Sequence, residues 1–112
     1  MHELSIAQSL LDTVRAHAGD HPGARVTKVG IRVGELSGVE PEALLFSFDV
    51  IVRETEFRDA VLDIERVPLR QHCEACGRDA SVVQFTLVCP DCGASTRAVA
   101  GDELQMSYLE LA

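Results

Sequence analysis

The sequence lacks tryptophan and is poor in other aromatic residues, with one tyrosine and four phenylalanines among 112 residues. Hydrophobic residues make up 46% of the chain, so we expect a modest core of valine, leucine and isoleucine, in one ordinary domain or two very small ones. No apolar run of about 18 residues is present, which excludes a transmembrane helix. The first residues are not a basic region followed by an apolar run, which excludes a secretory signal.

Basic residues are also scarce, and the formal net charge is -8. A nucleic-acid binder needs a basic face to neutralise phosphates, so this charge argues against nucleic acid and against an anionic membrane as partners. It is compatible with a metal-binding protein or with docking on a basic surface. We expect a cytoplasmic location, and in that reducing compartment four cysteines in two pairs favour metal over disulfides.

Hydrophobic periodicity predicts the first elements of the fold. Apolar residues spaced by three and four predict a first helix whose inward stripe is Leu4, Ala7, Leu11, Val14 and Ala18. Alternating β-branched residues then predict a strand within residues 24–36, with a phase irregularity around Thr27 and Lys28. Pro41 suits the first turn of a second helix. The later half of that helix, around Val50, could alternatively form a buried strand.

Two further strands complete the predicted sheet. The first covers residues 60–69, where Pro68 ends it or confines it to a sheet edge. The second follows residue 101, with Leu104, Met106 and Tyr108 on one face and a bulge near Tyr108 where the alternation changes phase.

These elements predict an α+β fold: a small three-stranded sheet with two helices packed on one face, interrupted by an inserted zinc-ribbon domain. We expect the α+β domain to comprise residues 1–68 and 102–112. The inserted domain, with rubredoxin-like knuckles, would then comprise residues 69–101.

The most specific pattern in the insert is a double Cys-x2-Cys motif, in which twelve residues separate Cys73 and Cys76 from Cys89 and Cys92. Two intervening residues let both thiolates of a pair reach one ion from a single tight turn, and the glycine after each pair permits the positive φ of such a turn. The spacing predicts a tetrahedral four-thiolate site for structural zinc, with no open position for catalysis. The apolar stretch 82–88 between the pairs is expected to be a strand.

Other interpretations of this motif remain open. The same ligands could hold iron for electron transfer, and a zinc-ribbon adaptor could bind proteins only. A nucleic-acid-binding ribbon is disfavoured because residues 68–101 carry three arginines against three acids and one aromatic residue, Phe85. His72 is either a further metal-associated side chain or, as we favour, a solvated one. His17 and His21 are expected to be solvated near the negative end of the first helix.

The first three residues have the character of a chelator. The amine of Met1 and the amide and imidazole nitrogens of His2 can close adjacent five- and six-membered rings around one ion. Either the amide nitrogen or the carboxylate of Glu3 could be a fourth donor. Nitrogen donors in one plane suit Ni(II) or Cu(II), which accept tetragonal geometry. Such an exposed site could take up a metal and pass it on.

Three motifs resemble a known family: "MHELSIAQSLL" at the start, "VGELSGVEPEAL" beginning at Val33, and "CEACG…CPDCG". Together, and in this order, they are similar to the HypA/HybF nickel-insertion proteins of [NiFe]-hydrogenase maturation, over essentially the whole chain.

The resemblance implies a nickel metallochaperone without an active site. It implies transferable Ni(II) bound through Met1, His2 and Glu3, and structural Zn(II) bound by the four cysteines. It also implies a HypB-type GTPase and the hydrogenase large-subunit precursor as partners. Some relatives also serve urease, and both monomers and homodimers occur in the family.

Overall fold

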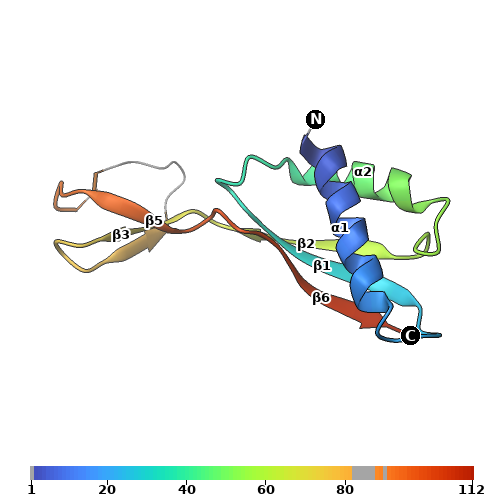
Figure 1. The fold of residues 1–112 in the computed structure, drawn as a ribbon. Coiled ribbons are helices and arrows are strands. Elements are labelled where there is room, and N and C mark those ends of the chain that lie inside the picture. Colours follow the sequence, from blue (N-terminus) through green and yellow to red (C-terminus); the bar gives the residue numbers. More distant parts are fainter. Residues whose placement is uncertain (1, 82–87, 90) are drawn as a thin grey trace.

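The computed structural model describes residues 2–81, 88–89 and 91–112, which form an elongated molecule of 56 × 27 × 16 Å (Figure 1). A three-stranded sheet with two helices forms one end, and a smaller sheet forms the other. The elements, in chain order, are α1 (His2–Ala18), β1 (Val26–Gly34), α2 (Pro41–Val52), β2 (Val61–Val67), β3 (Arg70–Cys73), β4 (Asp79–Ser81), β5 (Thr96–Ala100) and β6 (Leu104–Leu111). None of the helices in these ranges has the length and apolar character that crossing a membrane requires.

The larger sheet has the strand order β2-β1-β6. Strand β1 is parallel to β2 and antiparallel to β6. Parallel neighbours need a long connection, and α2 provides it between β1 and β2. Helix α1 packs beside α2, and both lie over the same face of the sheet (Figure 1). This arrangement confirms the predicted α+β fold with two helices on one face.

The core lies between the helices and this sheet. Its buried members come from α1, β1, α2, β2 and the turn after α2: Ala7, Leu10, Leu11, Val14, Val26, Val29, Ile31, Val33, Leu44, Phe48, Val52, Phe57 and Leu62. Helix α2 continues to Val52, so the alternative of a strand in its later half is wrong. Strand β2 ends at Val67, directly before Pro68, as predicted.

The inward face of α1 differs from the prediction at its first turn. Leu4 is 43% exposed, whereas Glu3 is only 9% exposed. The buried row therefore continues from Ala7 back to Glu3 through the helical i, i+4 relation. The prediction that Leu4 faces the core was wrong. An argument from hydrophobic periodicity assigns apolar residues to the inward face, so it chose Leu4 over the neighbouring Glu3.

Two irregularities in the pairing of β1 with β6 match the phase changes predicted from the sequence. One lies between Val26 and Lys28, and the other places Ser107 as an extra residue between Met106 and Tyr108. The second bulge moves Tyr108 to the face opposite Met106, so the prediction that these two side chains share a face was wrong. Leu109 returns to the helix-covered face and packs against the core with Met106.

On the helix-free face, the Tyr108 ring lies across Gly30 of the neighbouring strand. A Cβ at residue 30 would lie 2.0 Å from Cε2 of the ring. The tyrosine hydroxyl donates a hydrogen bond to the carboxylate of Asp63 on β2. One side chain from β6 thus spans all three strands.

The smaller sheet has the order β4-β3-β5. Two linkers, residues 68–69 and 101–103, join it to the larger sheet and lie close together near Gly34. A Cβ at Gly34 would lie 2.1 Å from the carbonyl oxygen of Gly101, so only glycine allows this approach. Leu69, 2% exposed, packs against the same region. The predicted domain boundaries at residues 68/69 and 101/102 remain predictions. The predicted strand at 82–88 lies almost entirely outside the described residues.

Candidate metal sites

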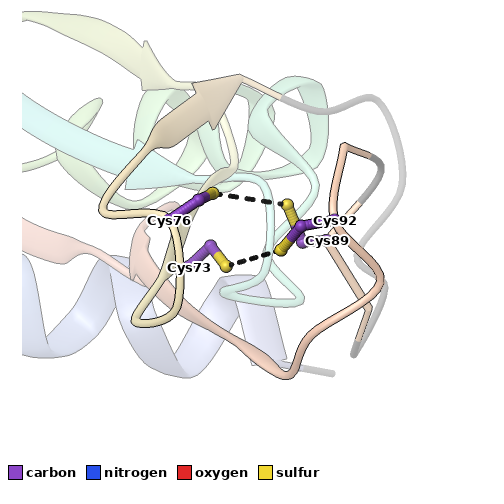
Figure 2. A group of neighbouring side chains, drawn as sticks. All are labelled: Cys73, Cys76, Cys89 and Cys92. Carbon is purple, nitrogen blue, oxygen red and sulfur yellow. Dashed lines mark hydrogen bonds between the residues drawn. The ribbon is translucent and has the colours of Figure 1, made fainter.

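The four cysteines converge from two turns (Figure 2). Both turns belong to the smaller lobe, the part of the molecule that contains the β4-β3-β5 sheet. Their Sγ atoms all lie within 4.8 Å of one another, with 3.4 Å from Cys73 to Cys92 and 3.9 Å from Cys76 to Cys89. All four are free thiols. Zn–S bonds of about 2.3 Å in a tetrahedron place sulfur atoms about 3.8 Å apart, which is close to the separations seen here. The donor set therefore fits a zinc ion.

The two turns have the same backbone geometry. The amide of Gly77 donates to the carbonyl of Cys73 at 2.8 Å, and the amide of Gly93 donates to the carbonyl of Cys89 at 2.9 Å. Both glycines have positive φ, 73° and 77°, as the sequence predicted. In each turn the first cysteine is buried and the second is exposed. Each turn thus contributes one buried and one exposed cysteine to the cluster.

The thiols of the cluster perturb one another strongly. The backbone amide of Cys76, assisted by the neighbouring thiols, lowers the pKa of Cys73 to about 7. At Cys92 the amide of Ala94 also favours the thiolate, but the neighbouring sulfur atoms, Cys73 above all, and the partial desolvation of the thiol outweigh it and raise the pKa to about 12. Four thiolates cannot share this volume without a cation, because each negative charge opposes the next. A divalent metal would remove that opposition.

Polar contacts link the described residues around the cluster. Gln71, 2% exposed, donates to the Thr96 hydroxyl at 2.6 Å. Arg78 and Asp91 form an ion pair at 2.7 Å between the two cysteine turns. Among the described residues of this lobe few apolar side chains are buried, and metal ligation by the four cysteines would add to its stability.

His72 contacts an acid rather than only solvent. Its Nδ1 lies 2.5 Å from Oδ1 of Asp79, and its side chain is 23% exposed. The prediction of a solvated side chain was wrong, because the β3–β4 pairing places Asp79 opposite His72. A metal-associated role for His72 has no support in this contact.

Two of the three predicted nickel-binding residues lie at the start of α1. Met1 is outside the described residues, His2 is the first residue of the helix, and Glu3 lies in its first turn. Oε2 of Glu3 accepts a hydrogen bond from the backbone amide of Glu40 at 3.2 Å. Of the histidines farther along, His17 and His21 are exposed at the opposite end of α1, as predicted.

Sequence analysis missed the contact between Glu3 and Glu40. The residues are 37 positions apart, and nothing in either stretch alone indicates a partner. The signal that could have found it is the pair of motifs, since "MHELS" and "GVEPEAL" each place an acid where a helix begins. Glu40 is the N-cap of α2, and its own side chain accepts a bond from the amide of Glu42.

A two-helix α+β layer joined to a lobe with a four-thiol cage defines this protein as a metal-binding one. Comparison with known proteins identifies the group. The family model for "Hydrogenase/urease nickel incorporation, metallochaperone, hypA" matches residues 1–111. The chain belongs to this HypA family of nickel-incorporation metallochaperones, which handle metal rather than catalyse a reaction.

Individual relatives are similar over their whole lengths. Hydrogenase maturation factor HypA of Geobacter metallireducens is 43% identical over 112 residues, covering 99% of each chain. Hydrogenase maturation factor HybF of Klebsiella pneumoniae is 40% identical over 111 residues, covering 98% of each chain. These matches confirm the family and the role in nickel incorporation that the three motifs predicted.

Two solved structures share the fold. A solution structure of HypA matches with a TM-score of 0.74 at 24% identity, covering 100% of this chain and 97% of the other. The nickel metallochaperone HypA of Helicobacter pylori matches with a TM-score of 0.67 at 23% identity, covering 97% and 96%.

Proposed function

We propose that this protein carries Ni(II) to the large-subunit precursor of a [NiFe]-hydrogenase, in the cytoplasm, together with a HypB-type GTPase. The nickel is bound at the chain's start by the amine of Met1, the amide and imidazole of His2, and Glu3. Zinc is bound by Cys73, Cys76, Cys89 and Cys92 and holds the smaller lobe together. The observation that carries the zinc part is the convergence of four free thiols within 4.8 Å. Family membership carries the nickel part.

The position of residues 2 and 3 in the first turn of α1 supports a nitrogen site. The first four N–H groups of a helix have no intrahelical carbonyl partner, so replacing the amide protons of residues 2 and 3 by a metal breaks no bond of the helical ladder. A helix N-terminus has a positive potential that disfavours an added cation. A divalent ion that takes two amidate nitrogens adds no net charge there, and Ni(II) and Cu(II) suit such planar nitrogen donors.

The hydrogen bond that the Glu3 carboxylate already accepts supports the amide nitrogen of Glu3, rather than the carboxylate, as the fourth nickel donor. Glu3 is 9% exposed, and its carboxylate already accepts a hydrogen bond from the Glu40 amide. Turning it toward a metal at the terminus would break that bond and leave the part-buried Glu40 N–H without this acceptor, which costs free energy. The amide nitrogen of Glu3 needs no such change.

Nickel titration of the untagged protein tests this function. We expect one equivalent to bind, and His2→Ala to abolish that binding while one zinc is retained. His17→Ala, on the exposed far end of the same helix, is the matched control and should bind nickel normally. A short extension ahead of Met1 should also abolish binding. Equal nickel affinity in the extended protein would refute the terminal site, and iron in place of zinc would indicate an electron carrier.

A further inference from the structure

A buried acid in the first turn of α1 is unusual in position and in surroundings. Glu3 occupies the last position of the helix's core-facing row, where an apolar residue would be expected, while the adjacent Leu4 is exposed. Burying a carboxylate is costly unless it receives hydrogen bonds. The amide of Glu40, which lies directly before α2, donates one such bond. Two helix N-termini, that of α1 and that of α2, therefore meet at one carboxylate, and both favour its negative charge.

The segment that presents the Glu40 amide is itself fixed at several points. It begins at Gly34, whose amide donates to the carbonyl of Glu103 at 2.7 Å. The Glu35 amide donates to Val67 at 3.1 Å and the Leu36 amide to Gly101 at 2.5 Å. Both linkers to the smaller lobe therefore hold this segment in place.

The remainder of the segment is equally constrained. The Ser37 hydroxyl accepts the amide of Val39 at 3.2 Å, and Gly38 has a φ of 78°. Val39 packs partly buried against the core. The Glu40 amide is thus a fixed donor, and a group bonded to it is fixed as well.

We propose that the Glu3 carboxylate is the positioning residue of the terminal metal site. It does not bind nickel; it holds the first turn of α1 against the start of α2. The backbone nitrogens of residues 2 and 3 are thereby presented in one arrangement. This inference rests on the proposed nickel site at the terminus. Without the anchor the terminal turn would fray, as chain ends do, and metal binding would have to order it.

Two substitutions at residue 3 separate positioning from ligation. Glu3→Gln keeps a side-chain oxygen of the same reach that can accept the Glu40 amide, whereas Glu3→Ala removes the acceptor. We expect Glu3→Gln to bind nickel within a few-fold of the unaltered protein and Glu3→Ala to bind it about tenfold or more weakly. At saturating nickel both variants should give the visible absorption spectrum of the unaltered protein, because the nitrogen donors are the same.

Hydrogen exchange of the Glu40 amide provides a readout that is independent of nickel. It should be slow in the unaltered protein and in Glu3→Gln, and faster in Glu3→Ala. Exchange of amides in the centre of β1 shows that each variant is folded.

A second pair of variants changes Glu40, the other partner in the contact. Glu40→Pro removes the donor at a φ of -85°, near the range of proline, and Glu40→Ala keeps the donor while removing the side chain. Only Glu40→Pro should weaken nickel binding.

Three outcomes would overturn the inference. Equal losses in Glu3→Gln and Glu3→Ala with an altered spectrum would make the carboxylate a ligand. Unchanged nickel affinity in Glu3→Ala, despite faster exchange at Glu40, would make the contact structural only. Equal losses in Glu40→Pro and Glu40→Ala would point to the Glu40 side chain instead. Nickel binding that is insensitive to His2→Ala would instead refute the proposed terminal site itself, so the two failures are distinguishable.

Discussion

Replacing Cys76 by serine is expected to release zinc and to unfold the smaller lobe selectively. Cys76 is exposed, so the substitution changes a metal ligand without opening a cavity in the interior. Cys73 is 2% exposed on β3, so the same change there would disturb packing as well as ligation. Cys76 therefore reports on the metal with the least structural interference.

The size of the effect follows from the ligand count. Structural zinc in small peptides contributes an apparent 10–16 kcal/mol or so. If four equivalent thiolates share it, one ligand accounts for about 2.5–4 kcal/mol, or an affinity roughly 10²–10³-fold weaker in Cys76→Ser. The lobe cannot offset this loss, because its described buried side chains are few and include the polar Gln71.

Competition with a chelator measures the zinc affinity, and hydrogen exchange locates the unfolding. Amides in the pairing of β3 with β5 should lose protection, whereas those in α1 and β1 should keep it because the larger core is separate. Ser95→Ala, an exposed change in the same lobe, is the control and should retain zinc. Unchanged zinc content in Cys76→Ser would refute the four-thiolate assignment.

Three further predictions concern the larger lobe and the terminus. Tyr108 is the only tyrosine, and its bond to Asp63 raises its pKa to about 12, so tyrosinate absorbance should report that value directly and Asp63→Asn should lower it. Because this pKa lies above that of the unfolded chain, about 10, the folded state holds its proton longer, and stability from this contact is lost as pH rises from about 10 to 12. Gly30→Ala should displace the ring, cost about 1–3 kcal/mol in denaturant unfolding, and return the tyrosine pKa toward about 10. Nickel binding near pH 7 should release about three protons if the Glu3 amide is a donor and about two if its carboxylate is, as calorimetry in buffers of different ionisation enthalpy would show.

Much of the fold could be predicted because local chemistry determines it. The 3.6-residue period of α1, Pro41 at the start of α2, and the alternation in β1 and β2 each indicated the observed element. The phase change near Tyr108 predicted a bulge, and the phase irregularity around Thr27 and Lys28 matches the other register shift. The Cys-x2-Cys pairs, each followed by glycine, predicted the two turns, since two intervening residues and a positive φ are properties of the chain alone.

Contacts between distant segments could not be predicted in this way. The bulge at Ser107 was expected, but which side chains it would redirect depended on the pairing with β1, and Tyr108 lies on the opposite face from the one predicted. His72 was expected in solvent and instead contacts Asp79, because the strand register brings the two together.

The sequence by itself determined the family, and it predicted the four thiolate donors and the chelating groups at residues 1–3, because these inferences need only spacing and side-chain type. Only the tertiary structure decided what the Glu3 carboxylate does. The packing of α1 against α2 turns Glu3 inward and places it beside an amide 37 residues away. The role of a carboxylate depends on which hydrogen-bond donor lies beside it, and three-dimensional packing rather than the local sequence sets that.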